Sequence, residues 1–155
     1  MVILFDIGGT KIRVANVSRP DSFDTPTVFA TPKTFDEGIE LLKKKISELS
    51  GGESIEYIIG GIAGMYSEEK RALLDGRNLS DWVGKPISKI LSESFGAEVI
   101  IDNDAALVGL GEAVFGAGKG FDIVAYITVS TGVGGARIVG KELDERSLGF
   151  EPGKQ

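Results

Sequence analysis

The residues best suited to chemistry lie in two similar glycine-rich segments, residues 5–14 and 129–139. Each segment has an apolar stretch, a turn rich in glycine and threonine, and a second apolar stretch. The turns read Asp6-Ile7-Gly8-Gly9-Thr10-Lys11 and Ser130-Thr131-Gly132-Val133-Gly134-Gly135. Glycines let backbone N–H groups turn towards an anion, and a threonine hydroxyl adds a donor. The pattern predicts two phosphate-binding hairpins, with a plain tight turn as the alternative for either one taken singly.

Carboxylates are the other chemical resource of the chain. Asp6 stands beside the first turn, where its oxygens suit a hard cation such as Mg2+. The sequence contains no His and no Cys, which excludes disulfides, zinc sites built from these residues, and imidazole bases. Acid–base chemistry must therefore come from carboxylates, Lys or Tyr.

A third cluster, Asp102-Asn103-Asp104, falls between a predicted strand and a predicted helix. Open α/β sheets bind ligands at the carboxyl ends of their strands, so this position suits a site. A carboxylate here is a helix cap, a metal ligand or a general base, and the residues leave the three open. In a chain without His, phosphoryl transfer to an alcohol would need such an aspartate to accept the hydroxyl proton.

Two other nucleotide-binding patterns fail. Residues 135–141 have the spacing of a Walker A loop, but Glu142 stands where a Mg2+-binding Ser or Thr is required, and the segment favours a strand. Residues 116–120 are glycine-rich but follow a helix, which favours a helix end over a dinucleotide site.

The elements that must position these residues follow from apolar periodicity and from glycine positions. Strands are predicted at 2–7, 12–17, 27–31, 57–62 and 98–101, with helices capped near Thr34 or Asp36 and running to 49, then at 86–95 and 105–115. Strands 123–129 and 136–139 flank a turn at 131–135, and the polar stretch 65–85 is predicted to form a long loop or a small hairpin. This order predicts an α/β domain with a mixed five-stranded sheet.

Composition narrows the class of partner. The 155 residues are 42% apolar and 26% charged, which is typical of a folded globular domain. The net charge is -6 without a basic cluster, so nucleic acid is not expected as a partner. The first residues lack a basic signal-peptide region and no apolar run approaches a membrane span, which leads us to expect a cytoplasmic location without membrane contact.

Together these residues resemble the ROK family of sugar kinases, within the actin-like, hexokinase-like ATPase superfamily. Besides the two hairpins, Gly61-Ile62-Ala63-Gly64 is similar to a G-x-P-G loop with Ala in place of Pro, and Asn78-Leu79-Ser80-Asp81-Trp82 to an N-L-x-x-W stretch. Asn103-Asp104-Ala105 and Phe115-Gly116-Ala117-Gly118 resemble an N-D-A helix and its G-A-G end. The resemblance implies a ribonuclease H-like, actin-like ATPase lobe over residues 1–118, with its sheet flanked by helices, and the beginning of a second lobe over residues 119–155.

The resemblance also implies an ATP-dependent kinase of hexoses or N-acetylhexosamines. Asp104 would be the general base, and the sugar would be bound by Asp104 with Gly64, Asn78, Asn103 and Glu151. Asp6 would organise Mg2+, directly or through water. The ATP phosphates would be held by Asp6, Gly8, Gly9, Thr10, Lys11, Ser130, Thr131, Gly132, Gly134 and Gly135. No zinc is expected, since the Cys-rich motif of the family is absent.

The resemblance does not specify the sugar, the phosphoryl donor or the form in which the chain would be active. Lys154 stands where the family has a His after the Glu151 motif, so the sugar is undetermined, and so is the phosphoryl donor. The sequence covers only the start of the second lobe, so activity would need a missing carboxy-terminal half or a homo-oligomer. Unpaired strand edges between residues 123 and 139 favour such association. The alternative function is a non-catalytic sugar-binding or assembly module that keeps the kinase fold.

Overall fold

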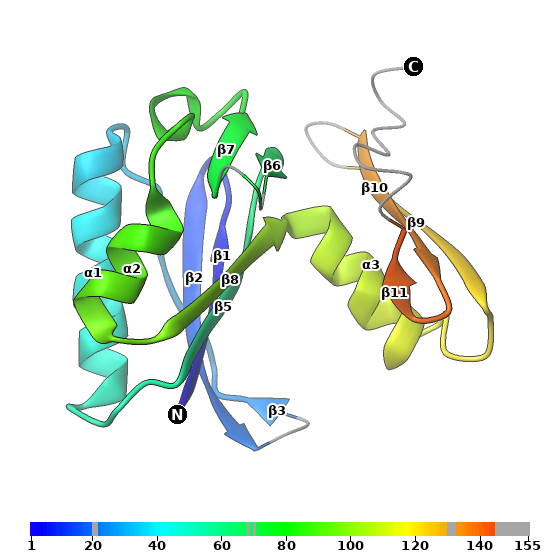
Figure 1. Cartoon of the computed structure of the whole chain (residues 1–155), viewed down its shortest axis with the longest axis horizontal. Helices are drawn as coiled ribbons and strands as arrows, with labels where there is room; N and C mark the ends of the chain where they lie inside the picture. Colours follow the sequence, from blue (N-terminus) through cyan, green and yellow to red (C-terminus); the bar gives the residue numbers. More distant parts are fainter. Residues whose placement is uncertain (20–21, 68, 70, 130–132, 145–155) are drawn as a thin grey trace. The chain divides into compact units, whose positions relative to one another are not determined.

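The structure is a computed structural model that describes residues 1–19, 22–67, 69, 71–129 and 133–144. Its chain forms two compact units, residues 1–102 and residues 103–155. Figure 1 shows the chain and labels most of its helices and strands. In the part of the chain that is described, no helix is long and apolar enough to cross a membrane.

A six-stranded mixed sheet forms the framework of the first unit. Its main path runs β3-β2-β1-β5-β8, and β4 also pairs with β2. β1 is antiparallel to β2 and parallel to β5, which confirms the predicted mixed sheet. The five predicted strands are present, and the sixth is the two-residue β3. The bounds are β1 Val2–Ile7, β2 Lys11–Arg19, β3 Ser22–Phe23, β4 Thr27–Ala30, β5 Tyr57–Ile62 and β8 Glu98–Asn103.

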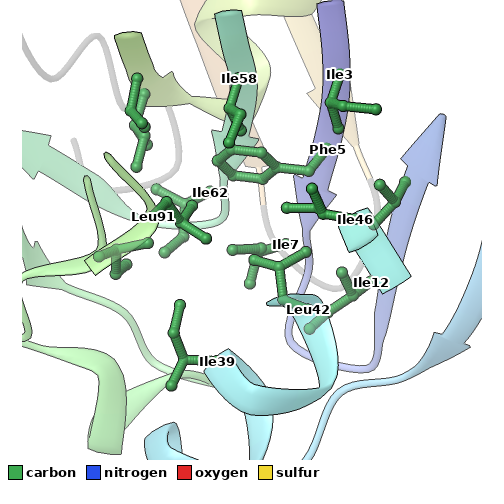
Figure 2. Close-up of a cluster of buried hydrophobic side chains, with 14 of the residues drawn as sticks. Ile3, Phe5, Ile7, Ile12, Ile39, Leu42, Ile46, Ile58, Ile62 and Leu91 are labelled. Carbon is green, nitrogen blue, oxygen red and sulfur yellow. The ribbon is translucent and has the colours of Figure 1, made fainter. Parts of the chain in front are cut away.

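Two helices, α1 (Phe35–Ser50) and α2 (Ile87–Phe95), cover one face of this sheet (Figure 1). Thr34 caps α1 by accepting a hydrogen bond from the Glu37 N–H, and both helices end at a left-handed glycine, Gly51 and Gly96. Figure 2 shows Ile and Leu side chains of the helices meeting those of the central strands in one apolar core. Burying these side chains supplies the main favourable free energy of the unit.

The stretch between β5 and α2 forms the predicted small hairpin, β6 (Met65–Ser67) with β7 (Ala72–Asp75), and a 3-10 turn, η1 (Ser80–Trp82). Trp82 is only 1% exposed, and its ring meets that of Phe35 edge to face at 5.1 Å. Gly38 of α1 leaves room for the indole, because a Cβ there would lie 2.2 Å from it. The segment after β7 is therefore anchored in the core.

The second unit consists of α3 (Asp104–Val114) and a three-stranded sheet of order β11-β10-β9. The strands are β9 Ile123–Val129, β10 Val133–Val139 and β11 Glu142–Leu143. Ala113 of α3 packs with Ala136 and Ile138 of β10 in a small core. The compact units do not coincide with the predicted division after residue 118, because α3 packs on β9 and β10. The lobe boundary remains a prediction.

One strand boundary differs from the sequence prediction. The glycines of residues 131–135 were expected to form a turn, but β10 begins at Val133, and Gly134 and Gly135 pair with Thr128 and Ile127. Glycine can adopt the extended conformation of a strand as well as that of a turn. The antiparallel pairing of β9 and β10 therefore continues through Gly134 and Gly135. Gly134 and Gly135 are therefore strand residues.

Lys141 fixes the end of α3. It occupies the turn between β10 and β11 with a positive φ of 69°, a conformation that is uncommon for a residue with a side chain. Its ammonium group donates to the carbonyl of Ala113, in the last turn of α3, and to those of Gly118, Lys119 and Phe121 at 3.2, 2.9 and 3.2 Å. A cation is favourable at a helix carboxyl end, so these contacts compensate for the backbone strain.

Candidate functional site

The first glycine turn is held rigidly from a neighbouring strand. The Gly8 N–H donates to the Lys11 carbonyl at 2.9 Å and closes the turn. Thr31, which follows β4, donates its hydroxyl to the Gly8 carbonyl at 2.6 Å and its N–H to the Thr10 carbonyl at 3.1 Å. Among the described residues, the N–H groups of Gly9 and Thr10 donate to no backbone carbonyl. The turn therefore presents two adjacent backbone donors and the Thr10 hydroxyl, a combination suited to phosphate oxygens.

Gly9 brings this turn against Asn78, another residue predicted for the site. A Cβ on Gly9 would lie 2.3 Å from the Asn78 Cβ. No side chain can occupy that space without moving one of the two segments. The predicted phosphate turn and the predicted sugar-binding asparagine are thus in direct contact.

Gly64 is held against the segment that leads to Asn78. Its φ is +126°, and a Cβ there would lie 2.1 Å from the Asp75 carbonyl and 3.1 Å from the Gly76 Cα. Gly76 in turn accepts a hydrogen bond from the Leu79 N–H at 3.0 Å. A residue with a side chain at position 64 would push this segment away, which explains the glycine physically.

Asp6 is paired with Arg13, a residue for which the sequence motifs predict no role. Asp6 and Arg13 are directly opposite each other on β1 and β2, and Arg13 Nη1 donates to Asp6 Oδ2 at 2.6 Å. Their side chains are 40% and 49% exposed, respectively. The alternation of exposed and buried residues along β2 places Lys11 on the same face as Arg13. One carboxylate and two cations therefore stand together at the end of the hairpin.

In the second unit, Asn103 and Asp104 occupy the start of α3. Asn103 is the N-cap and accepts the Ala106 N–H at 3.0 Å, while Asp104 Oδ1 accepts the Ala105 N–H at 2.8 Å. Negative charge is electrostatically favourable at this helix end. A Cβ on Gly134 would lie 3.6 Å from the Ala105 Cβ, so β10 runs beside the first turn of α3. Gly134 thus lies close to Ala105, the residue that follows Asp104.

Some predicted residues are not located by the structure. Ser130, Thr131, Gly132, Glu151 and Lys154 lie outside the described residues. Among the residues that are described, no three carboxylate-bearing side chains converge as metal ligands.

Asp81 has a structural role that its motif does not indicate. Its Oδ2 accepts the Phe35 N–H at 2.7 Å, across 46 residues, at the first turn of α1. No local pattern in the sequence indicates this bond, because its two residues lie 46 positions apart. For Arg13, the signal is the register that a short turn imposes on β1 and β2.

Comparisons with known proteins relate the chain to one family. The ROK family model matches residues 2–152. Glucokinase from Streptomyces coelicolor is 30% identical over 149 residues, which are 96% of this chain and 47% of the relative. A solved ROK family glucokinase from Streptomyces griseus, in complex with glucose and AMPPNP, is 32% identical with a TM-score of 0.83 over 96% of this chain and 47% of that chain.

A second solved structure is that of a glucomannokinase. The inorganic polyphosphate/ATP-glucomannokinase from Arthrobacter sp. strain KM is 27% identical, with a TM-score of 0.82 over 99% of this chain and 63% of that chain. The chain spans about half the length of the curated relatives it matches.

Proposed function

The chain belongs to the ROK family, and we propose from this premise that it is the amino-terminal portion of an ATP-dependent sugar kinase. The observation that carries the proposal is the likeness, over 96% of this chain, to a glucokinase in complex with glucose and AMPPNP. The substrates of the proposed reaction are a hexose or an N-acetylhexosamine and MgATP. Because the chain corresponds to about half of its relatives, we propose that this portion is inactive by itself.

Asp104 is the general base of the proposed reaction. It removes the proton of the attacking sugar hydroxyl, so that the oxygen can attack the terminal phosphorus as the bond to the leaving phosphate breaks. Its position at the start of α3 supports this role, because the helix N-terminus favours a negative carboxylate and the Ala105 N–H fixes its orientation. Asn103, Asn78, Gly64 and Glu151 are proposed to bind the sugar.

The first hairpin is proposed to hold the donor phosphates. The N–H groups of Gly9 and Thr10, the Thr10 hydroxyl and the Lys11 ammonium are donors at one turn, and the second hairpin, with Ser130, Thr131, Gly132, Gly134 and Gly135, would complete the set. Asp6 fits a hard divalent cation, since its carboxylate is partly exposed beside the turn. With a single carboxylate there, the remaining ligands would be water and phosphate oxygens, and the cation would supply charge neutralisation.

The proposal is tested by a phosphoryl-transfer assay and by sugar titration calorimetry. The chain is assayed with MgATP and a panel of hexoses and N-acetylhexosamines, beside Asp104→Asn, which keeps an acceptor for the Ala105 N–H. Asp36→Asn, at the first turn of α1, is the matched control.

Any transfer that is detected should fall roughly 10²- to 10⁴-fold in Asp104→Asn and stay unchanged in Asp36→Asn. Sugar binding without transfer is expected for an inactive portion. Sugar binding also fits the alternative of a non-catalytic sugar-binding module. The phosphoryl-transfer assay of a chain completed by the other half of the kinase separates the two, because only the kinase would transfer phosphate. A chain that neither binds nor phosphorylates any sugar in the panel would contradict the proposal.

A further inference from the structure

We propose that Arg13 is a phosphate-binding residue of the first hairpin: its guanidinium exchanges the Asp6 carboxylate for an oxygen of the donor phosphates when a divalent cation binds Asp6. This inference rests on the proposed function of the hairpin. It adds Arg13 to the phosphate-binding residues, and it predicts that the cation binds Asp6 before Arg13 contacts the phosphate.

The backbone of Arg13 is held by strands on both sides, and its side chain lies on the open face of the sheet. β2 lies between β1 and β4, and Arg13 pairs with Asp6 on one side and with Val28 on the other. The neighbouring residues Ile12 and Val14 are fully buried on the opposite face. The Arg13 side chain can therefore move only over the open face, where Asp6 and Lys11 also stand.

The contact between Arg13 and Asp6 is easy to give up. Both side chains are substantially exposed, at 49% and 40%, and ion pairs at such exposure contribute little to stability. A divalent cation bound to the Asp6 carboxylate would neutralise its charge and repel the guanidinium, which would weaken the bond from Arg13 to Asp6 Oδ2. Displaced from Asp6, Arg13 remains on the same hairpin as the two turn N–H donors.

Phosphate is the natural second partner of this group. A guanidinium presents a planar set of donors that matches two oxygens of one phosphate, which an ammonium group cannot do. Arg13 and Lys11 on one face leave a net positive charge once the cation neutralises Asp6. The same hairpin would then hold the cation through Asp6 and the phosphates through the turn and Arg13.

The exchange predicts opposite effects on two ligands, which a purely structural role for Arg13 would not produce. Arg13→Gln should weaken binding of magnesium tripolyphosphate about tenfold. Binding of Mn2+ in the absence of phosphate should be tighter, because Asp6 loses its competitor. Arg13→Lys, which keeps the charge without the planar donors, should be intermediate.

The measurement uses the 155-residue chain, with tripolyphosphate followed by titration calorimetry and Mn2+ by water-proton relaxation. Arg19→Gln is the matched control, because Arg19 lies on the same strand and bonds Ser22 instead of Asp6. Asp6→Asn tests the cation site separately and should remove the gain in tripolyphosphate affinity that Mg2+ gives.

The outcomes are separable. If Arg13→Gln binds magnesium tripolyphosphate like the parent chain, or weakens both ligands equally, the exchange is wrong while the phosphate hairpin stands. If the parent chain binds no tripolyphosphate with or without Mg2+, the proposed hairpin function fails and the inference fails with it. Circular dichroism of each variant verifies that the fold is kept.

Discussion

Among single residues, Gly9 is critical for the first hairpin because it has no side chain. Gly9 has an ordinary backbone conformation, so its identity is set by space: Asn78 occupies the position that a Cβ would take. Packing at this density tolerates an added methyl group poorly.

Gly9→Ala should therefore lower the free energy of unfolding by about 1–3 kcal/mol through overpacking. The same substitution at Gly111 should raise it by about 0.5–1 kcal/mol, because an alanine stabilises the helix and no atom lies within 4 Å of its Cβ. Differential scanning calorimetry of the two variants measures both effects. A Gly9→Ala chain as stable as Gly111→Ala would show that Asn78 moves aside freely.

At the scale of elements, α1 is capped by a residue far away in the sequence. Asp81 accepts the Phe35 N–H at 2.7 Å, while the local cap, Thr34, accepts the Glu37 N–H at the longer distance of 3.4 Å. The distant carboxylate thus ties the segment of Asn78 to the start of α1.

Asp81→Ala should cost about 1 kcal/mol of stability, because it removes a charged acceptor from a helix N-terminus. Asp81→Asn keeps an oxygen acceptor and should lose less. Urea denaturation followed by circular dichroism compares the two variants. Equal losses would mean that charge, rather than the hydrogen bond, carries the effect.

Lys141 likewise connects two elements, because its side chain joins the β10–β11 turn to the end of α3. Lys141→Met keeps the length of the side chain but removes its donors to four carbonyls, and we expect a loss of about 1–3 kcal/mol. Amide hydrogen exchange should speed up at Gly118 and Phe121, whose N–H groups donate to the carbonyls of Glu112 and Gly118.

Lys119→Met is the control for this prediction, since only the backbone carbonyl of Lys119 takes part in the contacts. Unchanged exchange in Lys141→Met, or an equal change in Lys119→Met, would contradict the role of the ammonium group.

The elements were predictable to the extent that their causes are local. Phe35, Ile39, Leu42 and Ile46 recur at helical spacing and are all buried, so α1 could be predicted from the sequence. The start of β10 could not be predicted, because glycines that permit a turn also fit a strand. Only the pairing with β9 shows that Gly134 and Gly135 belong to the strand. The bond from Phe35 to Asp81 joins residues that no local pattern connects.

The residues of the candidate site also differ in whether local sequence could predict them. Asp6, the Gly8–Gly9 turn and Asp104 stand out by residue type and by their place at element ends. Arg13 looks like one more exposed strand residue until the register sets it opposite Asp6. The contact between Gly9 and Asn78 depends on tertiary packing and could not be predicted from either motif.

At the scale of the whole molecule, β9 is an edge strand of its sheet in the part of the chain that is described. One of its faces exposes Ile123, Ile127 and Val129 by 59%, 55% and 76%. Long apolar edges of this kind pair with other chains unless something covers them.

We expect the 155-residue chain to associate as its concentration rises, and Ile127→Lys to reduce that association without lowering the thermal midpoint. Multi-angle light scattering over a concentration series measures the mass. Val28→Lys is the control, since Val28 is 52% exposed on the first unit. A chain that stays monomeric at all concentrations would contradict the prediction.

The single tryptophan of the sequence, Trp82, is buried against Phe35 and Gly38 in the core of the first unit. Its intrinsic fluorescence therefore reports the unfolding of that unit only, whereas circular dichroism reports both units. The difference between the two transitions gives the stability of each unit without labels or dissection. It also separates the variants: Gly9→Ala and Asp81→Ala should shift the emission transition, and Lys141→Met should leave it in place.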